Sequence, residues 1–573
     1  LDMGARPVEI RATTGSFYAT GETSEGNGAR VLGSGMGAGS ISGWDEERSD
    51  STPDTLPTLF TVVQEGTVDG TTLPPADAWQ GGIGPDDVFY TIASTGAGID
   101  LSGQADRVGG STLILQVDTV GESINFGAEV VDVASLTAKT AGAFTITGDA
   151  DVGTVLRGEA QIVLGSGCIL GVSGACEGVG DLVLEGDLRI ETPQVGLQAG
   201  DPNAPAPEGE MPVVRIGSTV EFRLETTEDI EETTFAVLQA GTLQSADLPT
   251  YSQFVGPVPL ESVDKYSAIS IQGDAEIDAI QNMNAATLFI QADAVHVQAP
   301  ELRGTELDNT TLVGNSILLE ATAGSVEAEI DSLLFQVMTF SDSAGAFEIR
   351  QNESFSPTDA DAGALPLADQ FINTPAGVAY TVTSTAGNIQ VDESFTDRVT
   401  GAHLILQSAS DREVRFAAGL AAVGSLTVND DAAISGESIV FALPASGSAQ
   451  IVSSNDQVYG APVVLEADAA LAASGDIIFH ETVLPDIAGS HTLALDSDGA
   501  VRFLADVGRA DLRLGALDIQ TPQQSFADPT LVFGSAPGET PVSVSVYTTG
   551  DIDLFFDGRS DVPATATIFV ANA

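Results

Sequence analysis

Carboxylate pairs spaced two residues apart recur along the chain and have the most evident capacity for chemistry. Two of them, Asp359 with Asp361 and Asp496 with Asp498, lie in segments rich in Gly, Ala and Ser. Calcium takes oxygen ligands gathered in a turn, so these four residues are the candidate calcium ligands. Neither segment matches an EF-hand loop or a glycine-rich calcium repeat, and solvated turn acids are the alternative interpretation.

Acid–base catalysis needs such carboxylates to converge, in glycosidases as a pair and in lyases commonly beside a basic residue. Among 82 acidic residues, close pairs arise by chance. The four histidines have no metal-ligand spacing: His296, His403, His480 and His491. We therefore expect no catalytic residue and no cofactor apart from calcium. A polysaccharide-active enzyme stays the second alternative for the function.

Cys168 and Cys176 are the only cysteines of the chain. They are eight residues apart with no histidine nearby, which argues against a zinc site. In an exported protein the pair would close a small loop as a disulfide, which is the prediction. Two free thiols in the core are the alternative.

The net charge of −62 comes from 82 Asp and Glu against 20 Lys and Arg. So few cations cannot displace the counterions of nucleic acid, and anionic membrane surfaces are disfavoured. No apolar stretch reaches the roughly 18 residues of a membrane helix, so direct membrane insertion is not expected. The acids are scattered through the chain, which places them on a folded surface. They serve either solubility in a salty medium or the binding of cations such as calcium between neighbouring molecules.

A longer pattern occurs three times: a Phe-x-Val/Ile-x-Gln strand, a Leu-Pro pair, a Tyr-led strand and a Leu-rich strand. The copies are Phe60–Gln64, Leu73-Pro74, Tyr90 and Leu113; Phe235–Gln239, Leu248-Pro249, Tyr266 and Leu288; and Phe347–Gln351, Leu365-Pro366, Tyr380 and Leu404. The Tyr and the Leu are 23, 22 and 24 residues apart, so the copies are in register. Copies one and three also share a Ser-Thr pair and an Asp-Arg-Val triplet. Self-similarity of this kind predicts a stacked repeat, which usually serves as a scaffold or a binding surface.

Alternating apolar and polar residues dominate the chain in runs of five or six, as at residues 112–116, 316–320 and 551–556. Amphipathic helical stretches are nearly absent and hairpin turn dipeptides are few, which indicates an all-β protein with parallel strands. We predict a parallel β-helix (β-solenoid) with loop insertions, in which like side chains stack. A Pro-rich interruption leaves open a division into two rod segments.

Two stretches interrupt the strand pattern and set the expected boundaries. Residues 1–57 are Gly-rich and are interpreted as an N-terminal cap or lateral segment. Residues 199–213 contain several prolines and are expected to form a loop or hinge. The remaining predicted segments are the β-helix segments 58–198 and 214–573, the latter with repeat modules at 235–300 and 347–520.

Three motifs follow one another at strand spacing near the C-terminal end: Tyr459-Gly460-Ala461, Gly475-Asp476-Ile477 and Leu514-Gly515-Ala516-Leu517. They resemble the repeats of very large bacterial surface and exported proteins related to filamentous haemagglutinins, and Ala422–Val428 is a second instance of the last motif. The resemblance covers roughly residues 58–145 and 230–520. It implies a bacterial protein that is secreted or held at the cell surface, with a role in adhesion or extracellular structure and no catalytic residue.

We expect an extracellular structural protein that assembles with copies of itself into a filament, sheath or surface layer. Val8–Arg11 and Thr567–Val570 are strand-like and could pair with a neighbouring molecule by strand addition. The alternative is an adhesin stalk that presents the Pro-containing insertions to a surface, including surface polysaccharide. The chain starts at Leu1 without an initiator Met, which indicates a removed signal peptide or a fragment of a longer precursor.

Overall fold

A computed structural model describes the chain as two compact units, Leu1–Asp293 and Ala294–Ala573. The described residues are 8–12, 58–69, 73, 88–101, 107–117, 124–125, 130–140, 144–147, 154–166, 181–200, 211–228, 230–278, 287–303, 307–329, 332–338, 345–356, 365–373, 376–430, 436–443, 450–522, 531–533, 544–550 and 552–557. Cys168, Cys176, Asp359 and Asp361 lie outside them, as do residues 201–210 and most of 1–57.

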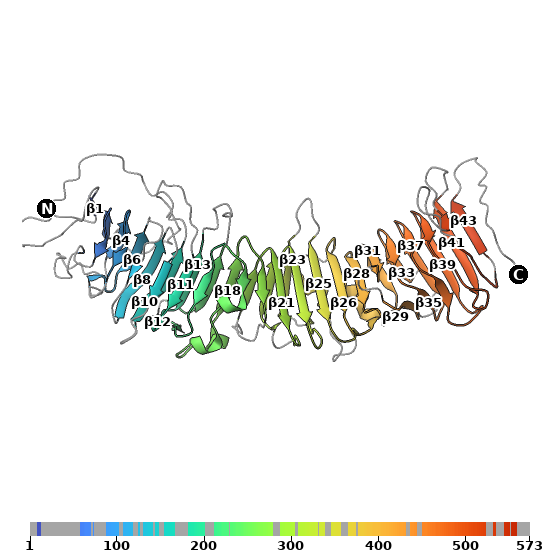
Figure 1. The fold of residues 1–573 in the computed structure, drawn as a ribbon, viewed down its shortest axis with the longest axis horizontal. Coiled ribbons are helices and arrows are strands. Elements are labelled where there is room, and N and C mark those ends of the chain that lie inside the picture. Colours follow the sequence, from blue (N-terminus) through green and yellow to red (C-terminus); the bar gives the residue numbers. More distant parts are fainter. Residues whose placement is uncertain are drawn as a thin grey trace, which may run out of the picture. The chain divides into compact units, whose positions relative to one another are not determined.

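The first unit is built from strands and short 3-10 helices (Figure 1). The strands of its long parallel sheet are, in sheet order, β1 (Val8–Ala12), β2 (Thr58–Gln64), β4 (Val88–Ser94), β6 (Thr112–Val117), β8 (Val130–Thr140), β10 (Thr154–Ser166), β13 (Gln194–Ala199), β16 (Thr234–Gln239), β18 (Lys265–Ser270) and β20 (Leu288–Gln291). β12 (Leu188–Glu191) pairs with the first half of β10 and with β15 (Glu221–Arg223). The smaller sheets are β3 (Val68–Asp69), β5 (Ile99–Asp100) and β7 (Ile124–Asn125); β14 (Val214–Ile216), β11 (Leu182–Glu185) and β9 (Phe144–Thr147); and β17 (Leu243–Gln244) with β19 (Ala275–Ile277).

The second unit contains three sheets that run through its later part. The first has the order β21 (Ala294–Ala299), β23 (Ser316–Ala321), β25 (Ala346–Gln351), β26 (Ala379–Ser384), β28 (His403–Ser408), β31 (Ser425–Val428), β34 (Gln457–Tyr459), β37 (Ile477–Phe479), β40 (Val501–Phe503) and β42 (Leu531–Phe533). The second is β27 (Ile389–Val391), β29 (Glu413–Phe416), β32 (Ser438–Phe441), β35 (Val463–Leu465) and β38 (Val483–Pro485). The third is β30 (Leu420–Val423), β33 (Ile451–Ser453), β36 (Ala469–Ala473), β39 (Thr492–Ser497), β41 (Ala516–Pro522) and β43 (Ile552–Asp557), while β22 (Thr310–Gly314) pairs with β24 (Leu334–Val337).

From β28 onward the chain visits these three sheets in strict rotation. β28, β29 and β30 lie one in each sheet, and the same order recurs up to β37, β38 and β39. Each strand therefore pairs in parallel with a strand one full rotation away, as β34 does with β37 and β36 with β39.

The recurring Phe, Tyr and Leu of the three copies occupy registered positions on neighbouring strands. Phe60 pairs with Tyr90 and Tyr90 with Leu113. The same sequence of partners holds for Phe235, Tyr266 and Leu288, and for Phe347, Tyr380 and Leu404. The Tyr and Leu side chains at these positions are at most 1% exposed. The spacing of 22 to 24 residues thus carries the chain to the next strand of the same sheet, where apolar side chains of successive strands stack in the core.

The prediction of an all-β protein with parallel strands is confirmed. The registered strand pairs of both units are parallel, and the runs predicted at 112–116, 316–320 and 551–556 correspond to β6, β23 and β43. Helices are short; the α-helix α2 (Glu393–Arg398) is capped by Asp392, whose side chain accepts a hydrogen bond from Ser394 N. In the described part of the chain, no helix has the length and apolarity needed to cross a membrane.

Candidate functional site

The Gln that ends the first strand of each copy is a buried corner residue. Gln64, Gln239 and Gln351 are fully buried, and each donates from Nε2 to the carbonyl oxygen three residues later. The Oε1 atom of Gln239 accepts from Val214 N (2.9 Å), and that of Gln351 accepts from Val326 N (3.1 Å). A buried amide must satisfy both its donor and its acceptor, and here it does so by joining two successive strands around a turn.

A serine completes the same corner on the next strand. Ser94, Ser270 and Ser384 are registered with the three Gln residues. Each hydroxyl donates to the carbonyl oxygen two residues after the Gln, at 2.7 to 3.1 Å, and accepts from the backbone N three residues after itself. The Ser-Thr pair shared by copies one and three therefore marks a turn, and copy two has the same serine four residues after its Tyr.

The Asp-Arg-Val triplet of copies one and three supplies an arginine that holds the Leu-Pro pair. Arg107 donates to Leu73 O, and Arg398 donates to Leu365 O. Arg398 also pairs with Glu329, with Nη2 and Oε2 2.7 Å apart, although its side chain is only 8% exposed. The triplet and the Leu-Pro pair thus belong to one structural device, because the guanidinium satisfies a carbonyl beside a proline.

The insertions of copies two and three fold back onto the core. In each, a 3-10 helix, Tyr251–Gln253 or Ala368–Gln370, precedes a Phe that enters the core. The two resulting aromatic boxes consist of Phe222, Phe235, Phe254 and Tyr266, and of Phe335, Phe347, Phe371 and Tyr380. Corresponding rings meet at nearly equal distances, 4.9 Å for Phe222 with Phe235 and 4.9 Å for Phe335 with Phe347.

Sequence reasoning missed the Gln and Phe of these insertions. Gln253 Nε2 donates to Gly217 O (2.9 Å) and Val220 O (3.1 Å), while Gln370 Nε2 donates to Ala328 O and Leu333 O, both at 3.0 Å. The available signal was the shared spacing Leu-Pro-x-x-x-Gln-Phe, which occurs in both copies. Buried Gln side chains again organise the chain in both places.

Burial governs the titratable groups of the boxes. It raises the pKa of the Tyr266 and Tyr380 hydroxyls, and in the described part of the chain neither hydroxyl has a hydrogen-bond partner. Burial also raises the pKa of Asp247, which is opposed by hydrogen bonds from Gln239 Nε2 (3.1 Å) and Gln244 N (3.0 Å).

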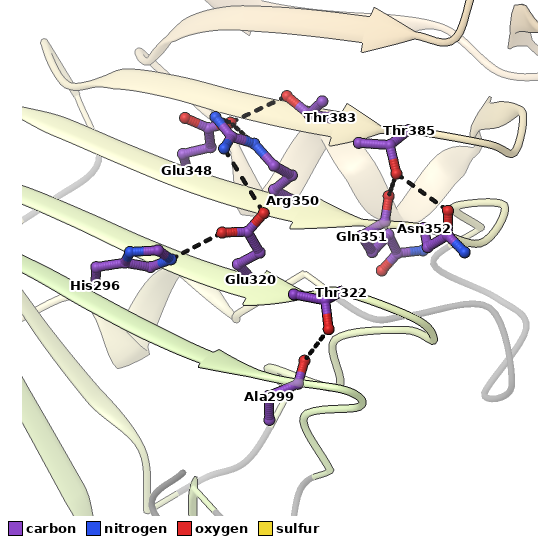
Figure 2. A network of polar contacts seen from close by, with 10 residues as sticks. All are labelled: His296, Ala299, Glu320, Thr322, Glu348, Arg350, Gln351, Asn352, Thr383 and Thr385. Atoms are coloured by element: carbon purple, nitrogen blue, oxygen red, sulfur yellow. Dashed lines mark hydrogen bonds and ion pairs between the residues drawn. The ribbon is translucent and has the colours of Figure 1, made fainter. Parts of the chain in front are cut away.

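A polar network crosses the outward side of four neighbouring strands of the second unit, as Figure 2 shows. His296 Nε2 lies 2.8 Å from Glu320 Oε2, and Arg350 reaches Glu320 at 3.7 Å and Glu348 at 2.9 Å. Thr383 Oγ1 donates to Glu348 Oε1 (3.2 Å). These residues lie on β21, β23, β25 and β26, so the network links each strand to the next and favours their pairing.

The other histidines also contact side chains of neighbouring turns or strands. His403 Nδ1 lies 3.0 Å from Ser425 Oγ, His480 Nδ1 lies 3.0 Å from Asp430, and His491 Nε2 lies 2.7 Å from Asp486. The structure brings no two of the four histidines together at a described site.

The calcium candidates that the structure describes are separate surface acids. Asp496 is exposed on β39, where it is registered with Ala472 and Gln520, and Asp498 is exposed in the following turn. Within the described ranges, no group of three or more His, Cys, Asp or Glu residues is placed to hold a metal ion. Calcium binding by Asp359, Asp361, Asp496 and Asp498 therefore remains a prediction.

Comparisons with known proteins give no family for the chain. No protein-family model, no curated protein and no solved structure matches it.

Proposed function

We propose that each unit is a parallel β-solenoid and that the chain is an extracellular structural protein of a bacterium. Its copies assemble into a filament, sheath or surface layer. This proposal keeps the resemblance to large exported proteins related to filamentous haemagglutinins, on the motifs around Tyr459, Gly475 and Leu514.

The observation that carries the proposal is that the recurring residues work inside the fold. The Gln and Ser of the three copies close corners, the Tyr fills the core, and the arginines of copies one and three hold a carbonyl. A repeat whose polar residues are used to stack one strand on the next is typical of a scaffold. The strict rotation of the chain through three parallel sheets supports the solenoid, because such winding adds one strand to each sheet per turn.

Assembly is tested by measuring the mass of the purified chain against its concentration. We expect sedimentation equilibrium to show concentration-dependent association, and negative-stain images to show polymers. Both are recorded with calcium and with a chelator, because the cation hypothesis predicts stronger association with calcium. A chain that stays monomeric at the highest concentrations under both conditions contradicts the proposal.

An adhesin stalk is the second candidate, favoured by the insertions of copies two and three. Tyr251 and Ile372 lie in these insertions and are 49% and 54% exposed. Both are large apolar side chains outside the core, of the kind that contact surfaces use. Replacing both by Ser should abolish binding to cells or to immobilised polysaccharide if the insertions bind. Ile487→Ser, at a 62% exposed position elsewhere, is the matched control. Product analysis in the same polysaccharide assay tests the enzymatic alternative.

A further inference from the structure

The long sheet of the first unit has an outward side without a single carboxylate. The acid-free face consists of the outward register positions of β2, β4, β6, β8, β10, β13, β16, β18 and β20, namely alternate residues within 59–63, 89–93, 112–116, 135–139, 161–165, 194–198, 234–238, 265–269 and 289–291. Thr, Gln, Ser, Gly and apolar residues fill these positions. In a chain with 82 Asp and Glu, this composition is a marked departure from the rest of the surface.

Apolar side chains are spread across the whole acid-free face. Phe89 on β4 is 39% exposed, and Ile114, Val163, Leu238 and Phe289 are half-buried on β6, β10, β16 and β20. They lie outside the core, since the side chains of their neighbours in each strand point inward and are buried. An extended uncharged surface with several apolar side chains is the usual composition of a protein contact.

The only two lysines of the chain lie on the same face. Lys139 Nζ is 3.5 Å from Gln198 Oε1 across β8 and β13, and Lys265 Nζ is 2.7 Å from Glu232, which precedes β16. The face is therefore neutral or slightly positive, whereas the whole chain carries −62.

Other outward positions of the same unit are densely charged. Asp132 on the first half of β8, Arg157 on β10, Glu191 on β12 and Arg223 on β15 form a registered ladder of alternating sign. Arg157 lies 3.9 Å from Asp132 and 2.7 Å from Glu191, and Arg223 lies 3.9 Å from Glu191. The absence of acids is thus specific to one side of the long sheet and does not follow from strand structure as such.

The size of the acid-free face suits a contact between folded proteins. Nine strands spaced about 4.8 Å apart, each contributing five residues at about 3.3 Å, cover roughly 700 Å². A standard protein interface buries about 800 Å² on each partner. The face is therefore large enough to form a stable contact without help from the charged sides.

Electrostatics select a second copy as the occupant. Two copies of a chain with a charge of −62 repel each other, and the cost of contact is lowest where neither brings a carboxylate. We infer that the acid-free faces of two copies pack sheet on sheet about a two-fold axis, in the manner of two layers of a β-sandwich. This inference rests on the proposed self-assembly and names its lateral contact.

A pair of matched valine substitutions tests the contact. Val163→Glu places a carboxylate in the middle of the acid-free face, and the two-fold axis brings two such charges into one interface. Val183→Glu is the control, because Val183 is also a half-buried outward valine on a strand of the same unit, β11. We expect Val163→Glu to raise the dissociation constant of the dimer at least tenfold in sedimentation equilibrium, and Val183→Glu to leave it unchanged.

Circular dichroism and thermal unfolding establish that each variant is folded, and Leu238→Glu on β16 repeats the test if Val163→Glu is not. Unchanged association of both folded variants, with an associating parent chain, overturns the acid-free face as the contact and leaves the proposed assembly standing. A monomeric parent chain overturns the assembly itself. Association that Val183→Glu weakens as much as Val163→Glu also overturns the inference, because the effect would then follow added charge alone.

Discussion

The second unit packs its aromatic rings in two different ways. In the aromatic box, Phe347 meets Phe335, Phe371 and Tyr380 with interplanar angles of 73°, 76° and 53°. In the aromatic column of Tyr459, Phe479, Phe503 and Phe533, successive rings are 5.0, 5.0 and 5.3 Å apart and nearly parallel, at 13°, 5° and 7°.

The difference follows from where the rings come from. The column rings lie at registered positions of β34, β37, β40 and β42, so identical backbone geometry places each ring over the last. In the box, Phe371 comes from an insertion that forms only an isolated bridge with Phe335. Its ring enters from outside the register and meets the others edge to face, which is a favourable geometry for aromatic pairs. Regular winding thus gives stacks, and an insertion gives a box.

The largest expected effect is that of removing a central ring. Phe347→Ala should lower the free energy of unfolding by about 3–5 kcal/mol, since it leaves a cavity lined by three rings. Phe479→Ala is the matched variant of the column and should cost less, because Phe479 contacts two rings and the loss is shared along the stack. Urea unfolding followed by circular dichroism gives the comparison. A larger loss for Phe479→Ala would show that the column, and not the box, is the tighter packing.

The box is also held by a buried arginine. Arg398→Met should cost about 1–3 kcal/mol, because it leaves Leu365 O without its donor and Glu329 without its partner, while the 41% exposure of Glu329 limits the loss. Glu329→Gln alone should cost less than Arg398→Met. A double-mutant cycle measures the coupling between the two side chains, and a coupling near zero would assign the whole effect to the Leu365 carbonyl.

The sequence predicted the register of the core but not its closure. Equal spacing of Tyr and Leu in the three copies was enough to place Tyr90 beside Leu113 and Tyr380 beside Leu404, because a repeat of one winding length brings like residues together. The use of Gln351 could not be predicted in the same way. Its partner Val326 lies 25 residues earlier, and only the turn geometry brings that N–H to its side chain.

The insertions show the same limit more strongly. Their prolines predicted projecting loops, yet Phe254 and Phe371 are 7% and 5% exposed in the boxes. Proline and polar composition describe the local chain, whereas the burial of one Phe depends on a gap in a core formed by other strands. The acid-free face was likewise invisible, because its residues alternate with buried ones and are spread over nine strands.

Two tyrosines sharpen the contrast between box and column by about 1–2 kcal/mol. Tyr459 Oη donates to Gln457 Oε1 (2.9 Å) in the column, whereas the buried hydroxyl of Tyr380 in the box has no partner among the described residues. Tyr459→Phe should therefore destabilise the protein by about 1–2 kcal/mol, because a buried acceptor loses its donor. Tyr380→Phe should be neutral or stabilising. Equal losses in the two variants, measured by thermal unfolding, would mean that the Tyr380 hydroxyl is satisfied in solution.

The smallest expected effect distinguishes the box of the first unit from that of the second. The corner residue Gln239 contacts the buried carboxylate of Asp247, whereas the Gln351 amide donates to the carbonyl of Ser354. Burial raises the pKa of Asp247 above its unfolded value, so the ionised form is less favourable in the folded chain than in the unfolded chain. This penalty is absent below the unfolded pKa of about 3.9 and is complete above the folded pKa.

Asp247→Asn removes the penalty and keeps an oxygen that can accept from Gln239 and Gln244. The variant should therefore match the parent chain near pH 4 and become progressively more stable than it as the pH rises towards 7. Glu276→Gln on β19, an exposed position, is the control and should show no such divergence. Thermal unfolding at several pH values measures the difference. A constant offset, or a gain that shrinks as the pH rises, would mean that the two hydrogen bonds outweigh burial at this corner and that the carboxylate stabilises it.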